Sequence, residues 1–166
     1  MQWMLRDARL GEEVLEIGPG PGLTTDLLRV RVAKLTTVEV DHDLAIKLSC
    51  RLAGTNVTVV AHDATEMQFP DASFTGAVCM TMLHHLPSAA LQNRMFEEVA
   101  RVLRPGAVFV GCDRLFHSRF DLTHLFDTKT PVQPGSLRGR LWLAGFDQIE
   151  IDIRKHDFRF MARKAC

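Results

Sequence analysis

The sequence "EIGPGPG" at residues 16–22 joins the strand-like "EVLEI" at 13–17 to the helix-like "LTTDLLRV" at 23–30. Glycines have no Cβ, so a ligand can lie directly against their backbone, and prolines fix the turn so that little conformational entropy is lost on binding. The turn is therefore predicted to form the floor of a cofactor site at the carboxyl end of the first strand. The alternative is an ordinary tight turn between a strand and a helix.

The spacing of the glycines argues against a nicotinamide dinucleotide as the ligand. A dinucleotide-binding turn has the pattern G-x-G-x-x-G. Counted from Gly18 the third position falls on Leu23, and counted from Gly20 it falls on Thr25. The pattern present here is E-x-G-x-G-x-G.

Short β-rich segments alternate with longer helical patterns along the chain, which is typical of a parallel sheet covered by helices. After 13–17, the predicted strands are "LTTVEV" at 35–40, "NVTVVAHD" at 56–63, "FTGAVCM" at 74–80 and "AVFVGC" at 107–112. The longest helix is predicted to begin after the capping residue Ser88 and to end at Pro105-Gly106.

The segments "DQIEIDIRK" and "DFRFMARK" alternate with period two near the end of the chain, and they predict an antiparallel hairpin. The predicted fold class is therefore α/β, with a doubly wound, seven-stranded sheet that is mostly parallel. We expect a single domain over residues 1–166, in which the apolar periodicity breaks down between about residues 113 and 135.

Composition limits the possible partners and compartments. The 166 residues are 46% hydrophobic, and 20 basic side chains balance 20 acidic ones, so no overall field attracts nucleic acid or an anionic membrane. The four cysteines form no C-x-x-C pair, and three lie in apolar surroundings, which favours structural thiols in a reducing compartment over a metal site. No signal peptide and no membrane span are recognisable, so we expect a cytoplasmic protein.

Five motifs, taken in order, resemble those of the class I S-adenosylmethionine-dependent methyltransferase family, in its small-molecule "type 11" branch. They are "VLEIGPGPG", "VEVD", "HDATEMQFPDASF", "MLHHLP" and "FEEVARVLRPGAVFV". The resemblance implies a Rossmann-like fold, S-adenosyl-L-methionine as the cofactor, and methyl transfer to a small-molecule acceptor. Compared with the family, the single domain over 1–166 is expected to have a short or truncated N-terminal cap, and residues 113–135 are expected to cover the acceptor.

The resemblance also implies roles for particular residues. The glycine turn would meet the methionine part of the cofactor, Glu39 would accept both ribose hydroxyls, and Asp63 would accept the adenine amino group. Asp41 lies near the same rim as Glu39, and for both acids the alternative is a charge at a helix N-terminus, which is the stronger reading for Asp41. For Asp63 the alternative is a turn-initiating role. The implied cofactor-binding residues are Glu16, Gly18, Pro19, Gly20, Gly22, Glu39, Val40, Asp63, Ala64 and Met80.

The acceptor is expected to meet residues that follow the fourth and fifth strands. His84 and His85 are the candidate catalytic residues, either as a general base or, as we favour, as part of the pocket wall. Phe116 and Phe120 are predicted to contact the acceptor from the 113–135 segment, which also carries His117 and His124; the alternative is that these phenylalanines are core.

One position departs from the family pattern. The family usually has Asp after the Phe of "SF", where this chain has Thr75-Gly76, and that Asp commonly braces the fourth strand. We expect some loss of local stability there without loss of cofactor binding.

Three functions remain open at this stage. They are a small-molecule methyltransferase, which we favour, a protein or nucleic-acid methyltransferase, and a cofactor-binding subunit without catalysis of its own. "TMLHHLP" lacks the Asn-Pro-Pro-aromatic type of sequence expected of the second class, and the basic residues near the C-terminus are more simply a solvated face.

Overall fold

The computed structural model describes residue 5, residues 7–115 and residues 130–166. Within these residues the elements, in chain order, are β1 (Glu13–Ile17), α1 (Leu23–Leu28), β2 (Lys34–Glu39), α2 (His42–Arg51), β3 (Val57–Ala61), β4 (Phe74–Met80), the 3-10 helix η1 (Leu83–His85), α3 (Ala89–Val102), β5 (Leu103–Arg114), α4 (Pro134–Leu143), β6 (Phe146–Ile153) and β7 (Asp157–Lys164). The predictions for Phe116, Phe120, His117 and His124 lie outside the described residues.

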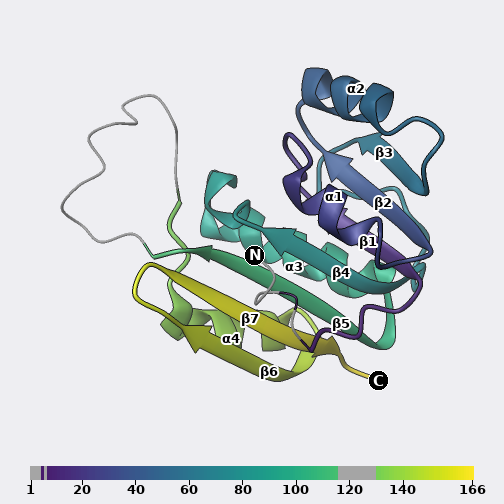
Figure 1. Ribbon diagram of the computed structural model, residues 1–166. Coiled ribbons are helices and arrows are strands. Elements are labelled where there is room, and N and C mark those ends of the chain that lie inside the picture. Colours follow the sequence, from purple (N-terminus) through teal and green to yellow (C-terminus); the bar gives the residue numbers. More distant parts are fainter. Residues whose placement is uncertain (1–4, 6, 116–129) are drawn as a thin grey trace, which may run out of the picture.

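The described strands form one seven-stranded sheet in the order β3-β2-β1-β4-β5-β7-β6 (Figure 1). β1 to β5 run parallel to one another, whereas β7 runs antiparallel to both β5 and β6. This confirms the predicted α/β fold with its C-terminal hairpin. The strand order reverses beside β1, and α/β sheets bind their ligands beyond the carboxyl ends of the strands at such a switch point.

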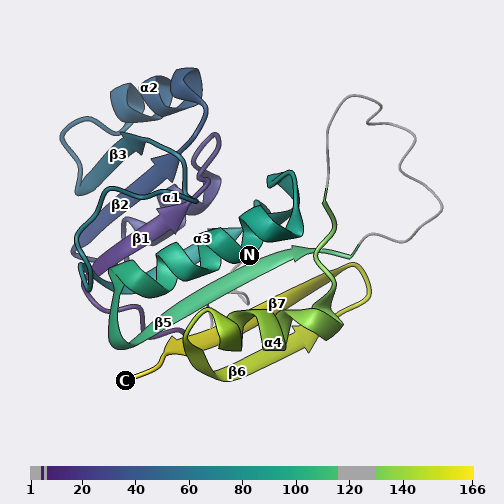
Figure 2. The ribbon, with the colours of Figure 1, turned by 180° about the vertical axis from the view of Figure 1, so that it is seen from behind.

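Helices cover both faces of the sheet. On the face seen in Figure 2, α3 and α4 lie over the strands, and Phe96 of α3 joins Phe109 and Phe160 in one buried cluster. On the other face, Leu28 of α1 joins Val14 of β1 in a second cluster. Because β1 contributes side chains to both clusters, it has the nearly continuous apolar sequence of a central parallel strand.

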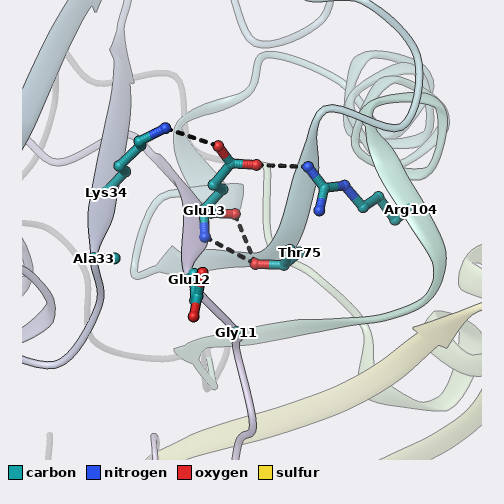
Figure 3. A pocket seen from close by; sticks show the side chains of 7 residues that line it. All are labelled: Gly11, Glu12, Glu13, Ala33, Lys34, Thr75 and Arg104. Atoms are coloured by element: carbon teal, nitrogen blue, oxygen red, sulfur yellow. Dashed lines mark hydrogen bonds and ion pairs between the residues drawn. The ribbon is translucent and has the colours of Figure 1, made fainter.

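Thr75 braces the start of β4 at the amino edge of the sheet (Figure 3). Its hydroxyl oxygen accepts the Glu13 N–H at 3.0 Å, and its O–H faces the carbonyl oxygens of Leu10 and Glu13, both 3.0 Å away. Thr75 therefore supplies the brace that the sequence analysis expected to be missing.

A hollow of about 370 Å³ opens at the same edge, lined in part by Glu13, Lys34, Thr75 and Arg104 (Figure 3). The Glu13 carboxylate pairs with both Lys34 and Arg104, so the charges here largely neutralise one another. These residues stand at the amino ends of the strands, whereas the glycine turn follows the carboxyl end of β1. The hollow is thus distinct from the candidate cofactor site.

The end of α3 was predicted wrongly. The helix stops at Val102 instead of continuing to Pro105-Gly106, because Leu103 is already extended and pairs with Phe74 of β4. A residue that precedes proline disfavours the helical conformation, which explains why the chain enters β5 ahead of Pro105.

Two cysteines are buried, whereas the sequence places three in apolar surroundings. Cys79 and Cys112 are buried, and both thiol pKa values are raised by burial, that of Cys112 to about 11. Cys50 and Cys166 are exposed.

Candidate functional site

The glycine turn after β1 presents one open backbone position. All three glycines of the turn have positive φ, at 63° for Gly18, 52° for Gly20 and 87° for Gly22, a conformation that L side chains rarely adopt. An added Cβ at Gly18 would lie 2.3 Å from Met82, and one at Gly22 would lie 2.5 Å from Leu48. At Gly20 no described atom lies within 4 Å of that position. A ligand can therefore approach the bare backbone at Gly20, while the other two glycines allow close packing within the protein.

Glu39 ends β2 and reaches across to this turn. Its side chain is buried, and one carboxylate oxygen, Oε2, accepts the Gly20 N–H at 3.0 Å. The other oxygen, Oε1, accepts the Asp41 N–H at 3.0 Å. Each carboxylate oxygen has two lone pairs, so both can accept further hydrogen bonds. Val40, next in the chain, is largely exposed.

Asp41 serves the helix that follows it. One oxygen of its carboxylate accepts the backbone N–H groups of Asp43 and Leu44, both at 3.0 Å, so Asp41 is the N-cap of α2. The structure thus gives Asp41 the helix-terminal role that was its alternative.

Asp63 follows β3 and forms a local turn. Its Oδ1 accepts the N–H of Thr65 at 2.7 Å and the hydroxyl of Thr65 at 2.8 Å. The residue is exposed, whereas Ala64 beside it is buried. The turn-initiating role is therefore present, and Oδ2 takes no part in these two hydrogen bonds.

Glu16 carries an incompletely paired buried carboxyl group. Its Oε2 accepts the hydroxyl of Thr25 at 2.7 Å, but its Oε1 is buried and has no hydrogen-bond partner among the described residues. Burial raises the pKa of Glu16 from its ordinary value of 4.5 to about 7; the Thr25 hydrogen bond opposes this shift and the nearby Asp26 charge adds to it. A buried acceptor without a donor is costly, and a bound ligand that supplied one would relieve that cost.

His84 is fixed by an acid that the sequence analysis missed. The Asp113 carboxylate, at the end of β5, lies 2.6 Å from the His84 Nδ1 and accepts the His84 backbone N–H at 3.0 Å. Both side chains are buried, and the ring of His85 stacks on that of His84 with centroids 4.1 Å apart. The acid at the end of the otherwise apolar "AVFVGCD" was the available signal.

The turn after β4, which leads into these histidines, approaches the glycine turn through Met82. Thr81 has a φ of 53°, which is unusual for a β-branched residue and marks local strain of the kind found at functional sites. Met82 then approaches Gly18, as described above, and η1 follows. Met80 itself is buried and receives the Cys112 thiol at 3.3 Å, so its side chain belongs to the core.

The family of methyltransferase domains matches residues 15–111, which is more than half of the chain. The chain belongs to the class I S-adenosylmethionine-dependent methyltransferases. The cofactor of this family is S-adenosyl-L-methionine.

Three known proteins are similar to this chain, two in sequence and one in fold. Ribosomal RNA small subunit methyltransferase A of Aromatoleum aromaticum is 32% identical over 144 residues, which cover 77% of this methyltransferase and 53% of that protein. Phosphatidylethanolamine N-methyltransferase of Cereibacter sphaeroides is 32% identical over 104 residues, covering 61% and 49%. The crystal structure of a SAM-dependent methyltransferase from Aquifex aeolicus has a TM-score of 0.78 at 19% identity, covering 99% and 89%. The chain spans about half the length of these two curated relatives.

The residues of this methyltransferase fit the cofactor. The open backbone at Gly20, the Glu39 carboxylate beside it and the unpaired oxygen of Glu16 all belong to the turn after β1 or to the strands that flank it. They offer acceptors for ribose hydroxyls and for an amino group, both of which S-adenosylmethionine carries.

Two further properties concern the part of the chain that the structure describes. No helix there is long and apolar enough to cross a membrane. No cluster of three or more His, Cys, Asp or Glu side chains in these residues could hold a metal ion.

Proposed function

We propose that this chain transfers a methyl group from S-adenosylmethionine to a small-molecule acceptor by in-line displacement. The single observation that best supports this is the 3.0 Å hydrogen bond from the Gly20 N–H to the Glu39 carboxylate, because it joins an open glycine backbone to an acid at the next strand end. Such an arrangement suits a ribose beside a backbone-lined turn.

Each candidate residue then has a defined task. Glu39 accepts hydrogen bonds from the ribose hydroxyls, and Glu16 accepts one from the amino group of the methionine part. Asp63 accepts the adenine amino group through the oxygen that Thr65 does not use. When bound, S-adenosylmethionine supplies a methyl group on a positively charged sulfur, and that sulfur keeps the electron pair of the broken bond.

The task at the acceptor end is placement. Holding an acceptor atom about 3 Å from the methyl group is worth about 7 to 11 kcal/mol in well-oriented reactions. His84 is buried against Asp113 and suits a wall, whereas His85 is exposed on the same turn. We therefore assign His85 as the side chain nearer the acceptor and His84 as its support. The roles of Phe116 and Phe120 stay predictions.

A small molecule is favoured over RNA by the charges of the hairpin. In the register of β6 and β7, Asp147 stands opposite Arg163 and Asp152 opposite Arg159. An acidic residue therefore stands opposite each of these two arginines, which makes this part of the hairpin less suited to a phosphate backbone. Similarity to a ribosomal RNA methyltransferase makes RNA the second candidate, and similarity to a phosphatidylethanolamine methyltransferase supports the first.

The experiment is a measurement of S-adenosylhomocysteine production by the isolated chain. The acceptors are a panel of small amines, alcohols and thiols, phosphatidylethanolamine in micelles, and unmodified ribosomal RNA. Glu39→Ala is the control that should abolish turnover at low cofactor concentration. Turnover with a small molecule supports the proposal. Turnover with RNA alone would replace it by the second candidate, and cofactor binding without any turnover would favour a subunit that needs a partner.

A further inference from the structure

Arg51, in the last turn of α2, contacts the glycine turn. Its Nη2 donates to the carbonyl oxygens of Pro21, at 3.2 Å, and Gly22, at 3.4 Å. Its Nη1 donates to the Asp26 carboxylate of α1 at 2.7 Å. One guanidinium group therefore joins the end of α2 to both the turn and the first helix.

The absence of a side chain at Gly22 makes this contact possible. A Cβ at Gly22 would lie 2.3 Å from the Nη2 of Arg51 and 2.5 Å from Leu48 of the same helix. At position 22, the space that any other amino acid would fill with its side chain is thus occupied by α2. Gly22 is needed for this packing as well as for its positive φ.

The turn is consequently held at two points by the unit of β2 and α2. Glu39, before α2, accepts the Gly20 N–H, and Arg51, at the end of α2, binds the carbonyl groups of Pro21 and Gly22. The contact made by Glu39 and the contacts made by Arg51 differ in how they involve a bound ligand. Ribose hydroxyls would share the oxygens of Glu39 with the Gly20 N–H, whereas the contacts of Arg51 involve neither Gly20 nor Glu39.

We propose that Arg51 is a positioning residue for cofactor binding, which keeps the turn in its binding conformation while the oxygens of Glu39 accept the ribose hydroxyls. This rests on the proposed cofactor site. A guanidinium group suits the task because its planar fork can donate to a carboxylate and to carbonyl oxygens at once.

The test uses titration calorimetry with S-adenosylhomocysteine on the whole chain. Arg51→Ala should raise the Kd about 3- to 10-fold, since the turn must then be ordered on binding. Arg51→Lys should give a smaller increase, because an ammonium group can keep the pair with Asp26 but not all three contacts. Arg29→Ala is the matched control: Arg29 also pairs with Asp26, at 3.0 Å, but lies outside the turn, and its removal should leave the Kd unchanged.

Amide hydrogen exchange separates positioning from general stability. In Arg51→Ala the amides of Gly20 and Gly22 should exchange faster in the free protein, while the urea midpoint stays close to that of Arg29→Ala. If Arg51→Ala left the Kd unchanged while Glu39→Ala raised it, this inference would be overturned and the proposed cofactor site would stand. Unchanged affinity in both variants would overturn the inference together with the proposed site.

Discussion

The carboxylate of Asp113 binds both the backbone N–H and the ring Nδ1 of His84, at 3.0 and 2.6 Å. An ionised carboxylate only accepts hydrogen bonds, so with Asp113 in that form the Nδ1 of His84 is the donor of the 2.6 Å contact. The pair joins the end of β5 to the turn after β4 and orients the ring on which His85 stacks. It therefore fixes the geometry of the expected acceptor wall.

We expect Asp113→Ala to destabilise the protein by about 3 kcal/mol, because it leaves two buried donors unpaired at about 1 to 3 kcal/mol each. Asp113→Asn should cost less. Its amide can accept the backbone N–H and donate to Nδ1, which would move the His84 proton to Nε2. Urea unfolding measures the loss of stability, and the nitrogen chemical shifts of the His84 imidazole report its tautomer. Equal losses in the two variants, without a change of tautomer, would contradict this assignment.

Glu16 should make stability depend on pH. Between pH 4.5 and about 7 the folded protein holds a proton on Glu16 that the unfolded chain has lost, because the pKa is raised on folding. Raising the pH through this window should therefore destabilise the protein by up to about 3 kcal/mol from this group. Glu16→Gln should lack that component, so the difference between the two proteins in urea unfolding at pH 5 and pH 8 isolates it. A constant difference would show that Glu16 is ionised throughout.

The two acids around the end of β2 should respond differently to removal. Glu39→Ala should weaken binding of S-adenosylhomocysteine by about 1 to 3 kcal/mol, since two ribose hydroxyls lose their acceptor. Asp41→Ala should instead lower the free energy of unfolding by about 1 kcal/mol through the lost cap of α2. Calorimetry and thermal denaturation on both variants make the comparison. Equal losses of affinity would mean that the ribose acid is misassigned.

The brace at the amino edge gives a test far from the site. Thr75→Val keeps the shape but removes the acceptor of the Glu13 N–H, and should cost about 1 to 2 kcal/mol of stability. Thr75→Ser keeps the hydroxyl and should cost less. Cofactor affinity should stay unchanged in both variants, and a loss of affinity would show that the amino edge communicates with the turn.

The sequence was sufficient for the sheet because its strands carry period-two or continuous apolar patterns between clear turn residues. The sequence did not predict the end of α3 correctly. The helix ends before Pro105 because Leu103 already pairs with Phe74 across the sheet. Such a pairing joins residues 29 positions apart and leaves no local signal.

Candidate site residues could be predicted where they stand in a motif, but not where their role depends on contacts within the folded chain. Glu16, Gly20 and Glu39 were found from the order of motifs. Asp113 and Arg51 were missed, because each acts through a partner distant in sequence and neither stands in a motif that resembles the family. Nor could the sequence show that, of the three glycines in the turn, it is Gly20 that faces open space.

Titration calorimetry with S-adenosylmethionine and, separately, with a nicotinamide dinucleotide tests the central claim most directly. We expect saturable binding of S-adenosylmethionine with a Kd at least about fivefold lower than that of Glu39→Ala, which corresponds to about 1 kcal/mol, and no binding of the dinucleotide. Saturable binding of the dinucleotide without binding of S-adenosylmethionine would contradict the account.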